Sequence, residues 1–169
     1  MSQNCPKQKI WYNGQMDNIK LIETLRVLLS DNVALKFKAH GYHWNVESDD
    51  FKQFHEFFRE IYLDYEEATD EYAEWLRILK AFAPYRLTDF FDMATVTEPV
   101  IVGDPEPMIE DLYDSIELHI EALMVAGDLA NQAKQYGLAN FFADRQTVSQ
   151  KFCWQLRASM EKPEMEMED

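Results

Sequence analysis

The chain has 169 residues and a formal charge of −15, and 47% of its residues are hydrophobic. This length and apolar content suit one domain with a substantial core, and the acidity opposes non-specific binding to nucleic-acid phosphates. Its two cysteines, Cys5 and Cys153, are far apart and form no CxxC pattern, which argues against a thiolate zinc site and against a disulfide framework. No segment resembles a signal peptide or a membrane span, so we expect a cytoplasmic protein.

Four long helical patterns follow one another along the chain. In each, apolar residues recur at the three- and four-residue intervals of an amphipathic helix. The expected helices cover residues 17–45, 50–82, 104–136 and 138–161. They predict an all-α four-helix bundle, preceded by an N-terminal extension (residues 1–16) and followed by an acidic tail (residues 162–169).

The expected helix boundaries rest on residues that start or stop helices. Ala83-Pro84 is expected to end the second helix, and Gly137 to stop the third. Asp104 followed by proline is a strong start for the third helix. The long connection between the second and third helices lets them run parallel, and its sequence LTDFFDM predicts a short extra helix.

Two histidines and two acids in the first half of the chain form a possible set of metal ligands. His43 and His55 are twelve residues apart, and Asp70 and Glu74 are four apart, which places the two acids on one face of a helix. Imidazole combined with carboxylate suits iron, manganese or zinc. On one continuous helix, however, His55 and Asp70 would lie about 22 Å apart, whereas metal–ligand bonds are only about 2 Å long. Either these residues are not a site, or two copies of the chain meet and share it.

The spacing of these four residues resembles the ferroxidase motif of the Dps family of mini-ferritins. The family pattern is a histidine, eleven residues, a histidine, fourteen residues, an aspartate, three residues and a glutamate. His43, His55, Asp70 and Glu74 match it without a gap, and the flanking sequence YHWN around His43 matches as well. LTDFFDM resembles the family's crossover helix, and KFCWQLRA near the C-terminus resembles its last helix. The likeness covers roughly residues 17–160.

The resemblance implies a ferritin-like four-helix bundle that forms a hollow shell of twelve identical subunits. Its ferroxidase sites would lie in antiparallel two-fold dimers, with His43 and His55 from one subunit and Asp70 and Glu74 from the other. Fe(II) would bind there, be oxidised by hydrogen peroxide in preference to dioxygen, and be stored inside as ferric mineral. Zinc or manganese could occupy the same ligands, because imidazole and carboxylate accept several metals.

Three features depart from the family pattern. Arg59 stands where many relatives carry an acid four residues after the second histidine, so a second iron ion would meet a positive charge. Among the positions near the start of the last helix that commonly line pores, Asp144 remains acidic while two others do not. Residues 1–16 carry only two basic side chains and the C-terminal tail is acidic, so we expect no direct DNA binding.

Three functions therefore stay open at this point. The leading hypothesis is a peroxide-consuming ferroxidase that stores iron. The second is a DNA-protecting shell with degraded iron chemistry, which the missing basic arm opposes. The third is metal sequestration, of zinc or manganese for example, without efficient iron oxidation, and Arg59 keeps this alternative open.

Overall fold

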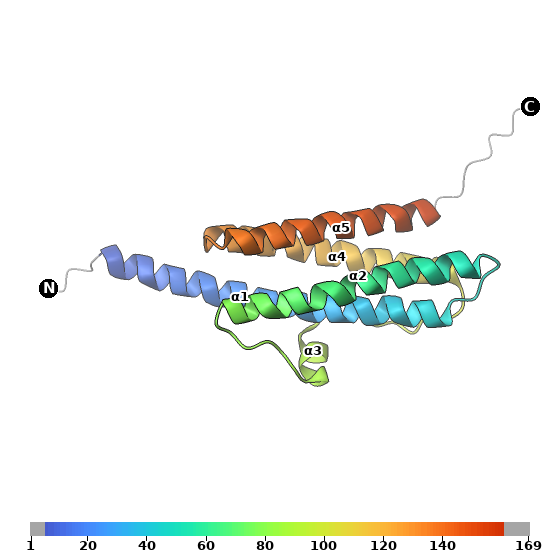
Figure 1. The fold of residues 1–169 in the computed structure, drawn as a ribbon, viewed down its shortest axis with the longest axis horizontal. Coiled ribbons are helices and arrows are strands. Elements are labelled where there is room, and N and C mark those ends of the chain that lie inside the picture. The colour runs from blue at the N-terminus through green and yellow to red at the C-terminus, as the bar shows by residue number, and fades with distance from the viewer. Residues whose placement is uncertain (1–5, 161–169) are drawn as a thin grey trace, which may run out of the picture.

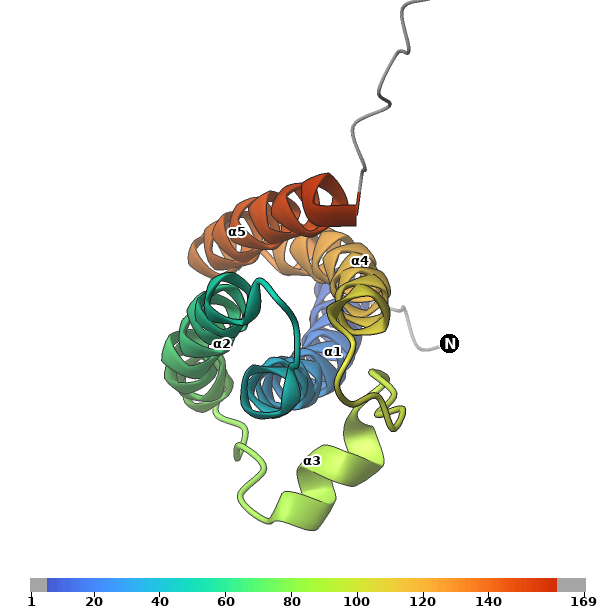
Figure 2. The same cartoon turned by 90° about the vertical axis from the view of Figure 1, so that its right-hand side faces the viewer.

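The computed structural model describes the backbone of residues 6–160 and the side chains of residues 18–160. This part of the chain contains the helices α1 (Pro6–Asn45), α2 (Phe51–Ile78), α3 (Leu87–Met93), α4 (Pro105–Gln132) and α5 (Tyr136–Met160). The four long helices form a bundle in which α2 and α4 run in the same direction (Figure 1), and α3 lies outside it against α1 (Figure 2). The predicted all-α four-helix bundle with a short crossover helix is thus confirmed. Within the described residues, no helix is both long and apolar enough to cross a membrane.

The first helix begins earlier than expected. α1 starts at Pro6, eleven residues before the predicted start at residue 17, and is 40 residues long. Proline is tolerated in the first turn of a helix because the N–H that it lacks has no partner there in any case. Part of the predicted N-terminal extension therefore belongs to α1, while the predicted acidic tail lies outside the described residues.

Two predicted helix ends are wrong for a shared reason. α2 ends at Ile78 and α4 at Gln132, each four residues before the expected stop. Beyond each end a lysine adopts the left-handed conformation, with φ of 63° at Lys80 and 59° at Lys134. The N–H of the following residue then bonds the carbonyl five residues earlier, at 2.9 and 2.8 Å. This closure satisfies the last carbonyls of both helices without glycine or proline.

Gly137, predicted to stop the third helix, lies instead in the first turn of α5. A Cβ atom at this position would be 3.0 Å from Cη2 of Trp75 on α2. Glycine therefore permits a close approach of the two helices at this end of the bundle.

The core fills the space between the four long helices along the length of the bundle. Its largest fully buried side chains include Phe58, Tyr65, Tyr72 and Phe142, and burial of each apolar side chain of this kind stabilises the fold by about 1.5–3 kcal/mol. Cys153 is a free thiol in this core, and burial raises its pKa to about 12.

The crossover is anchored to α1 by a buried carboxylate. Asp31 accepts hydrogen bonds from the N–H of Thr95 at 2.5 Å, from its hydroxyl at 2.9 Å and from the N–H of Val96 at 3.1 Å. Three donors from two neighbouring residues fix the chain just after α3. The anchor holds α3 on the outer side of α1, which is the helix that carries His43.

Candidate metal centre

The two predicted histidine ligands lie where α1 ends and α2 begins. His43 is in the last turn of α1 and His55 is in the second turn of α2, and residues 46–50 reverse the chain between them. Their rings stack, with centroids 3.6 Å apart and planes inclined by 24°. The short connection thus places two imidazoles that are twelve residues apart in the sequence next to each other.

Each of these rings is held by the backbone of the other histidine. Nδ1 of His43 lies 2.6 Å from the carbonyl oxygen of His55, and Nδ1 of His55 lies 2.8 Å from the carbonyl oxygen of His43. A carbonyl can only accept, so each Nδ1 carries the proton and donates it. In the neutral form of each ring, Nε2 then keeps the lone pair with which an imidazole binds a metal. Such a hydrogen bond on the other ring nitrogen is the usual way in which proteins orient histidine ligands.

Aromatic side chains enclose one side of the histidine pair. The ring of His40 stacks on Tyr62 at 4.0 Å and also lies 4.0 Å from Trp44, between centroids. Burial, with a smaller contribution from neighbouring His43, lowers the pKa of His40, which keeps it neutral at neutral pH. Trp44 is 60% exposed. The pair therefore has a packed side and an exposed side.

The two predicted acidic ligands lie far from the histidines. Asp70 and Glu74 are exposed on α2, the same continuous helix that carries His55 fifteen residues before Asp70. The helical rise puts His55 and Asp70 about 22 Å apart, as predicted. Among the described residues, no group of three or more histidine, cysteine or acidic side chains is close enough to hold one metal ion. One subunit thus brings together the histidine half of the set and holds the acidic half separately.

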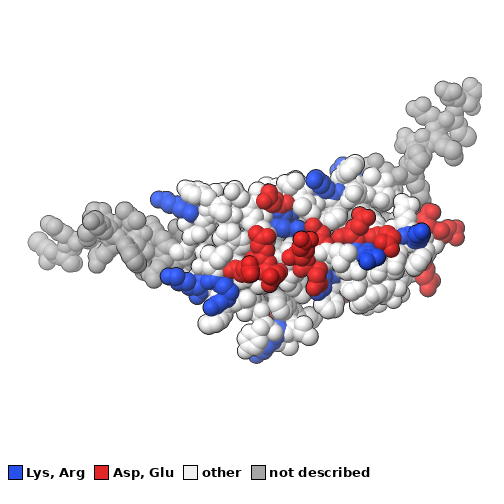
Figure 3. Space-filling model, in the orientation of Figure 1, with Lys and Arg blue, Asp and Glu red and all other residues white. Residues whose placement is uncertain are grey.

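His55 and the two acids share one face of α2. Spacings of three and four residues place a row of side chains on this face, which we call the α2 stripe: His55, Arg59, Leu63, Glu66, Asp70 and Glu74. Its start carries imidazole and guanidinium, its far end carries three carboxylates, and Leu63, 46% exposed, lies midway. Arg59 is 3.6 Å from Glu56, and Glu66 is paired with Lys36. Figure 3 shows acidic side chains gathered in a band over α2.

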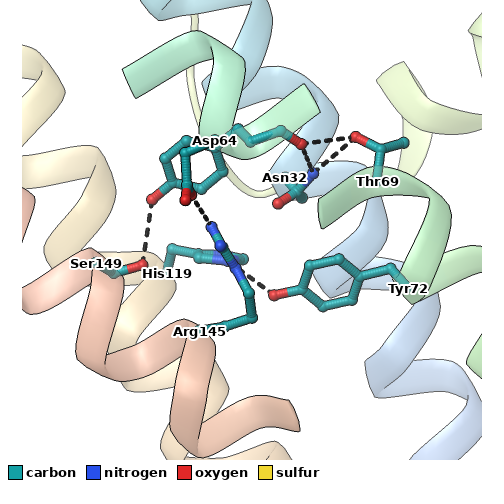
Figure 4. Close-up of polar contacts among 8 residues, drawn as sticks. Asn32, Asp64, Thr69, Tyr72, His119, Arg145 and Ser149 are labelled. Carbon is teal, nitrogen blue, oxygen red and sulfur yellow. Dashed lines mark hydrogen bonds and ion pairs between the residues drawn. The ribbon is translucent and has the colours of Figure 1, made fainter. Parts of the chain in front are cut away.

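The centre of the bundle holds a polar cluster that the sequence did not reveal (Figure 4). Arg145 on α5 donates to Asp64 on α2 at 2.5 Å, and its guanidinium lies 5.4 Å from the ring centroid of Tyr65. His119 on α4 is fully buried, with Nε2 3.4 Å from the hydroxyl of Tyr72.

This cluster opposes a metal ion in the bundle centre. Burial, reinforced by the charge of Arg145, lowers the pKa of His119 to about 3, so the imidazole is neutral. The remaining charge is a guanidinium paired with one carboxylate, and the guanidinium would repel a metal cation. The Glu-x-x-His pairs that hold di-iron centres inside bundles are also missing from the sequence. The centre of the bundle is therefore poorly suited to a metal ion.

Comparisons with known proteins agree with this architecture. A model of the ferritin-like domain family matches residues 22–165. DNA protection during starvation protein 2 of Bacillus anthracis is 24% identical over 141 residues, which is 83% of this chain and 97% of that protein. Antigen TpF1 of Treponema pallidum is 36% identical over 78 residues, 46% of this chain and 44% of that protein.

Solved structures give the same result for the fold. The Dps protein of Vibrio cholerae, described as a ferritin-like diiron-carboxylate protein, superposes with a TM-score of 0.82 at 25% identity, covering 86% of this chain and 92% of that one. Dps of Thermosynechococcus elongatus superposes with a TM-score of 0.87 at 22% identity, covering 92% of this chain and 99% of that one.

Proposed function

Because the chain belongs to the ferritin-like family, as a mini-ferritin of the Dps type, we propose that it is an iron-storing ferroxidase. Its substrate is Fe(II), its oxidant is hydrogen peroxide or dioxygen, and its product is a ferric mineral held inside a hollow homo-oligomer. We place this protein in the cytoplasm and propose that twelve copies, built from two-fold dimers, form the shell.

The main support for this proposal is the stacked pair of His43 and His55, whose rings are oriented by hydrogen bonds from Nδ1 to backbone carbonyls. The two rings stack with centroids 3.6 Å apart, and backbone carbonyls engage both Nδ1 atoms, which leaves both Nε2 atoms to bind a metal. Two imidazoles alone leave the coordination of an iron ion incomplete. Asp70 and Glu74 are exposed carboxylates at the right spacing to share one ion, yet they lie about 22 Å from the histidines on the same rigid helix. A second copy of the chain supplies the missing half.

The α2 stripe supports an antiparallel, two-fold pairing of the copies. Placing two α2 helices antiparallel brings His55 of one copy to Asp70 and Glu74 of the other, and the same contact is made twice. The midpoint of this register falls near Leu63, an exposed apolar side chain suited to the centre of a contact. In the same register Arg59 meets the acidic end of the opposite stripe, so the charges of the two copies are complementary.

A second exposed apolar surface favours association of copies. Phe82, Leu87, Phe91 and Val100, in and around α3, are each at least 76% exposed. Monomeric proteins seldom leave a group of large apolar side chains uncovered. α3 packs on α1, the helix that carries His43, so a partner that contacts the histidine pair can cover this surface as well.

The ligand set suits the proposed chemistry. Fe(II) accepts both imidazole nitrogen and carboxylate oxygen. Two Fe(II) ions deliver two electrons, which with two protons reduce one hydrogen peroxide to two waters, whereas a single electron would release hydroxyl radical. Arg59, one turn beyond His55, places a positive charge close to the position of a second ion. We therefore propose one tightly held Fe(II) per site and a second that binds weakly.

One alternative function is favoured by the same arginine. If Arg59 keeps the second ion out, the site would sequester a single metal ion, zinc or manganese included, without fast iron oxidation. Shell-type DNA protection is the other alternative, and the charge of −15 opposes direct contact with DNA phosphates. We propose that the shell does not bind DNA directly, and a strong gel shift at physiological salt would contradict this.

The proposal is tested by loading the protein with Fe(II) without oxygen and then adding stoichiometric hydrogen peroxide. The wild type is compared with a His43→Ala, Asp70→Ala variant, and the ferric absorbance and the soluble iron core are followed. Fast oxidation and a soluble core in the wild type alone would support the ferroxidase. Equally slow oxidation in both proteins would leave metal sequestration as the better account.

A further inference from the structure

A groove lies at the end of the bundle where α2 begins and α5 ends. It has a volume of about 790 Å³ and is lined by the aromatic side chains Phe54, Phe57 and Trp154. Trp154 is 60% exposed, so the described part of the chain leaves the groove open. Its walls can accept apolar or aromatic side chains of a partner.

The rim of this groove is acidic. The lining residues include four carboxylates and one ammonium group: Asp49, Asp50, Glu56, Glu60 and Lys52. A tryptophan face and surrounding carboxylates both attract cations. The groove therefore favours an occupant that combines lysine or arginine with apolar and aromatic side chains.

The beginning of α1 has this chemistry. Residues 6–12 read PKQKIWY, and Lys7 and Lys9 are the only charged side chains among the first 16 residues of a strongly acidic chain. The first turns of α1 extend past the end of the bundle formed by the other helices (Figure 1). A short helical segment on its own is only marginally stable in water, and a binding partner would stabilise it.

A second basic and aromatic stretch, residues 75–86, is a weaker candidate. Arg77 donates to the carbonyl of Ala81 and lies 4.4 Å from the ring of Phe82, and Arg86 is paired with Asp89 at 2.5 Å. Its arginines are therefore already engaged within the subunit. Charge complementarity favours the first turns of α1 as the occupant.

The occupant cannot come from the same subunit. α1 runs along the whole bundle, and residues 18–45 alone span about 40 Å. The start of α1 and the groove lie at opposite ends of the molecule (Figure 1). We propose that the first turns of α1 from one copy dock into the groove between α2 and α5 of another copy.

Such a head-to-tail contact differs from the two-fold pairing proposed above. It joins two different surfaces, so repeated copies close into a ring or continue as a filament. Combined with two-fold pairs, a three-fold ring of these contacts closes a shell of twelve copies. This last step rests on the proposed two-fold dimer, whereas the groove contact itself does not.

Charge reversal and its rescue test the contact. The first variant is Lys7→Glu, Lys9→Glu, the second is Glu56→Lys, Glu60→Lys, and the third combines all four changes. The matched control is Glu110→Lys, Asp114→Lys, which changes the charge as the second variant does but at exposed positions of α4. Analytical ultracentrifugation gives the mass of each assembly, and circular dichroism checks that the helices remain folded.

We expect the first two variants to fall from the full assembly to dimers, the combined variant to regain the full mass, and the control to keep it. The proposal is overturned if the first two variants retain the full assembly, or if combining them fails to restore it. Deleting residues 1–16 should act like the first variant. A full-sized deletion product would mean that another segment fills the groove and would also refute the proposal.

Metal binding separates this inference from the proposed function. Dimers of the Lys7→Glu, Lys9→Glu variant should still bind Fe(II) without oxygen, because neither lysine belongs to the α2 stripe. If the wild type bound no Fe(II) while charge rescue still restored the assembly, the proposed function would fail and the groove contact would stand.

Discussion

Buried His119 predicts how the stability of the protein depends on pH. In the folded protein its pKa is lowered to about 3, chiefly by burial and further by the charge of Arg145, whereas an unfolded histidine titrates near 6.5. Between these values the unfolded state binds one more proton than the folded state. The contribution of the neutral buried imidazole to the free energy of unfolding is therefore fully present above about pH 6.5, and it is lost as the pH falls toward 3.

The magnitude follows from the number of protons. A difference of one proton changes the free energy of unfolding by about 1.4 kcal/mol per pH unit, so acidification from pH 6.5 to 5 removes up to about 2 kcal/mol through this group. The His119→Gln variant has no titrating group at this position and keeps a polar group near the hydroxyl of Tyr72. Urea unfolding of both proteins at fixed concentration, at several pH values in this range, isolates the contribution because other titrating groups cancel.

We expect the wild type to lose this extra stability relative to His119→Gln as the pH falls. Parallel pH profiles for the two proteins would refute the reasoning, because they would mean that the folded imidazole accepts a proton as readily as the unfolded one.

Three further predictions concern the core and the site. Asp64→Asn leaves the Arg145 guanidinium buried without its partner and should lower the free energy of unfolding by about 3–5 kcal/mol. The double variant Asp64→Leu, Arg145→Met removes both charges, so its free energy of unfolding, measured with urea, should be close to that of the wild type. Gly137→Ala brings a Cβ to 3.0 Å from Trp75. The usual gain of about 1 kcal/mol in helix propensity should therefore appear in thermal unfolding only when the Trp75→Leu substitution is also present. The same gain with and without Trp75→Leu would count against the close contact. Arg59→Ala should strengthen the weaker of two Fe(II) binding steps in anaerobic titrations, and an unchanged isotherm would exclude the arginine as the obstacle.

The helical pattern of the sequence was enough to predict the four long helices and the short crossover helix. It misplaced the ends of α2 and α4 because the left-handed residues there are lysines, Lys80 and Lys134, which carry no sequence signal for a helix stop. It also missed the start of α1 at Pro6, since the apolar pattern of the bundle begins only later in the chain.

Within the candidate site, the family resemblance implied that His43 and His55 belong together, and helix geometry predicted that Asp70 lies out of reach of His55. The reciprocal hydrogen bonds between rings and carbonyls could not be predicted, because they depend on how the connection between α1 and α2 turns. The core cluster around Arg145 and His119 could not be predicted from the sequence for a similar reason. Its members come from three helices and have no common motif.

We propose that each site draws its histidines from one subunit and its acids from another, and mixed assemblies test this sharing directly. One variant carries His43→Ala, His55→Ala, and the other carries Asp70→Ala, Glu74→Ala, so neither alone has a complete site. In a mixed two-fold pair one site loses both halves and the other keeps both. Random co-assembly of equal amounts should therefore restore about one quarter of the wild-type rate of Fe(II) oxidation by peroxide. Co-assembled protein that is no more active than either variant alone would contradict the shared site.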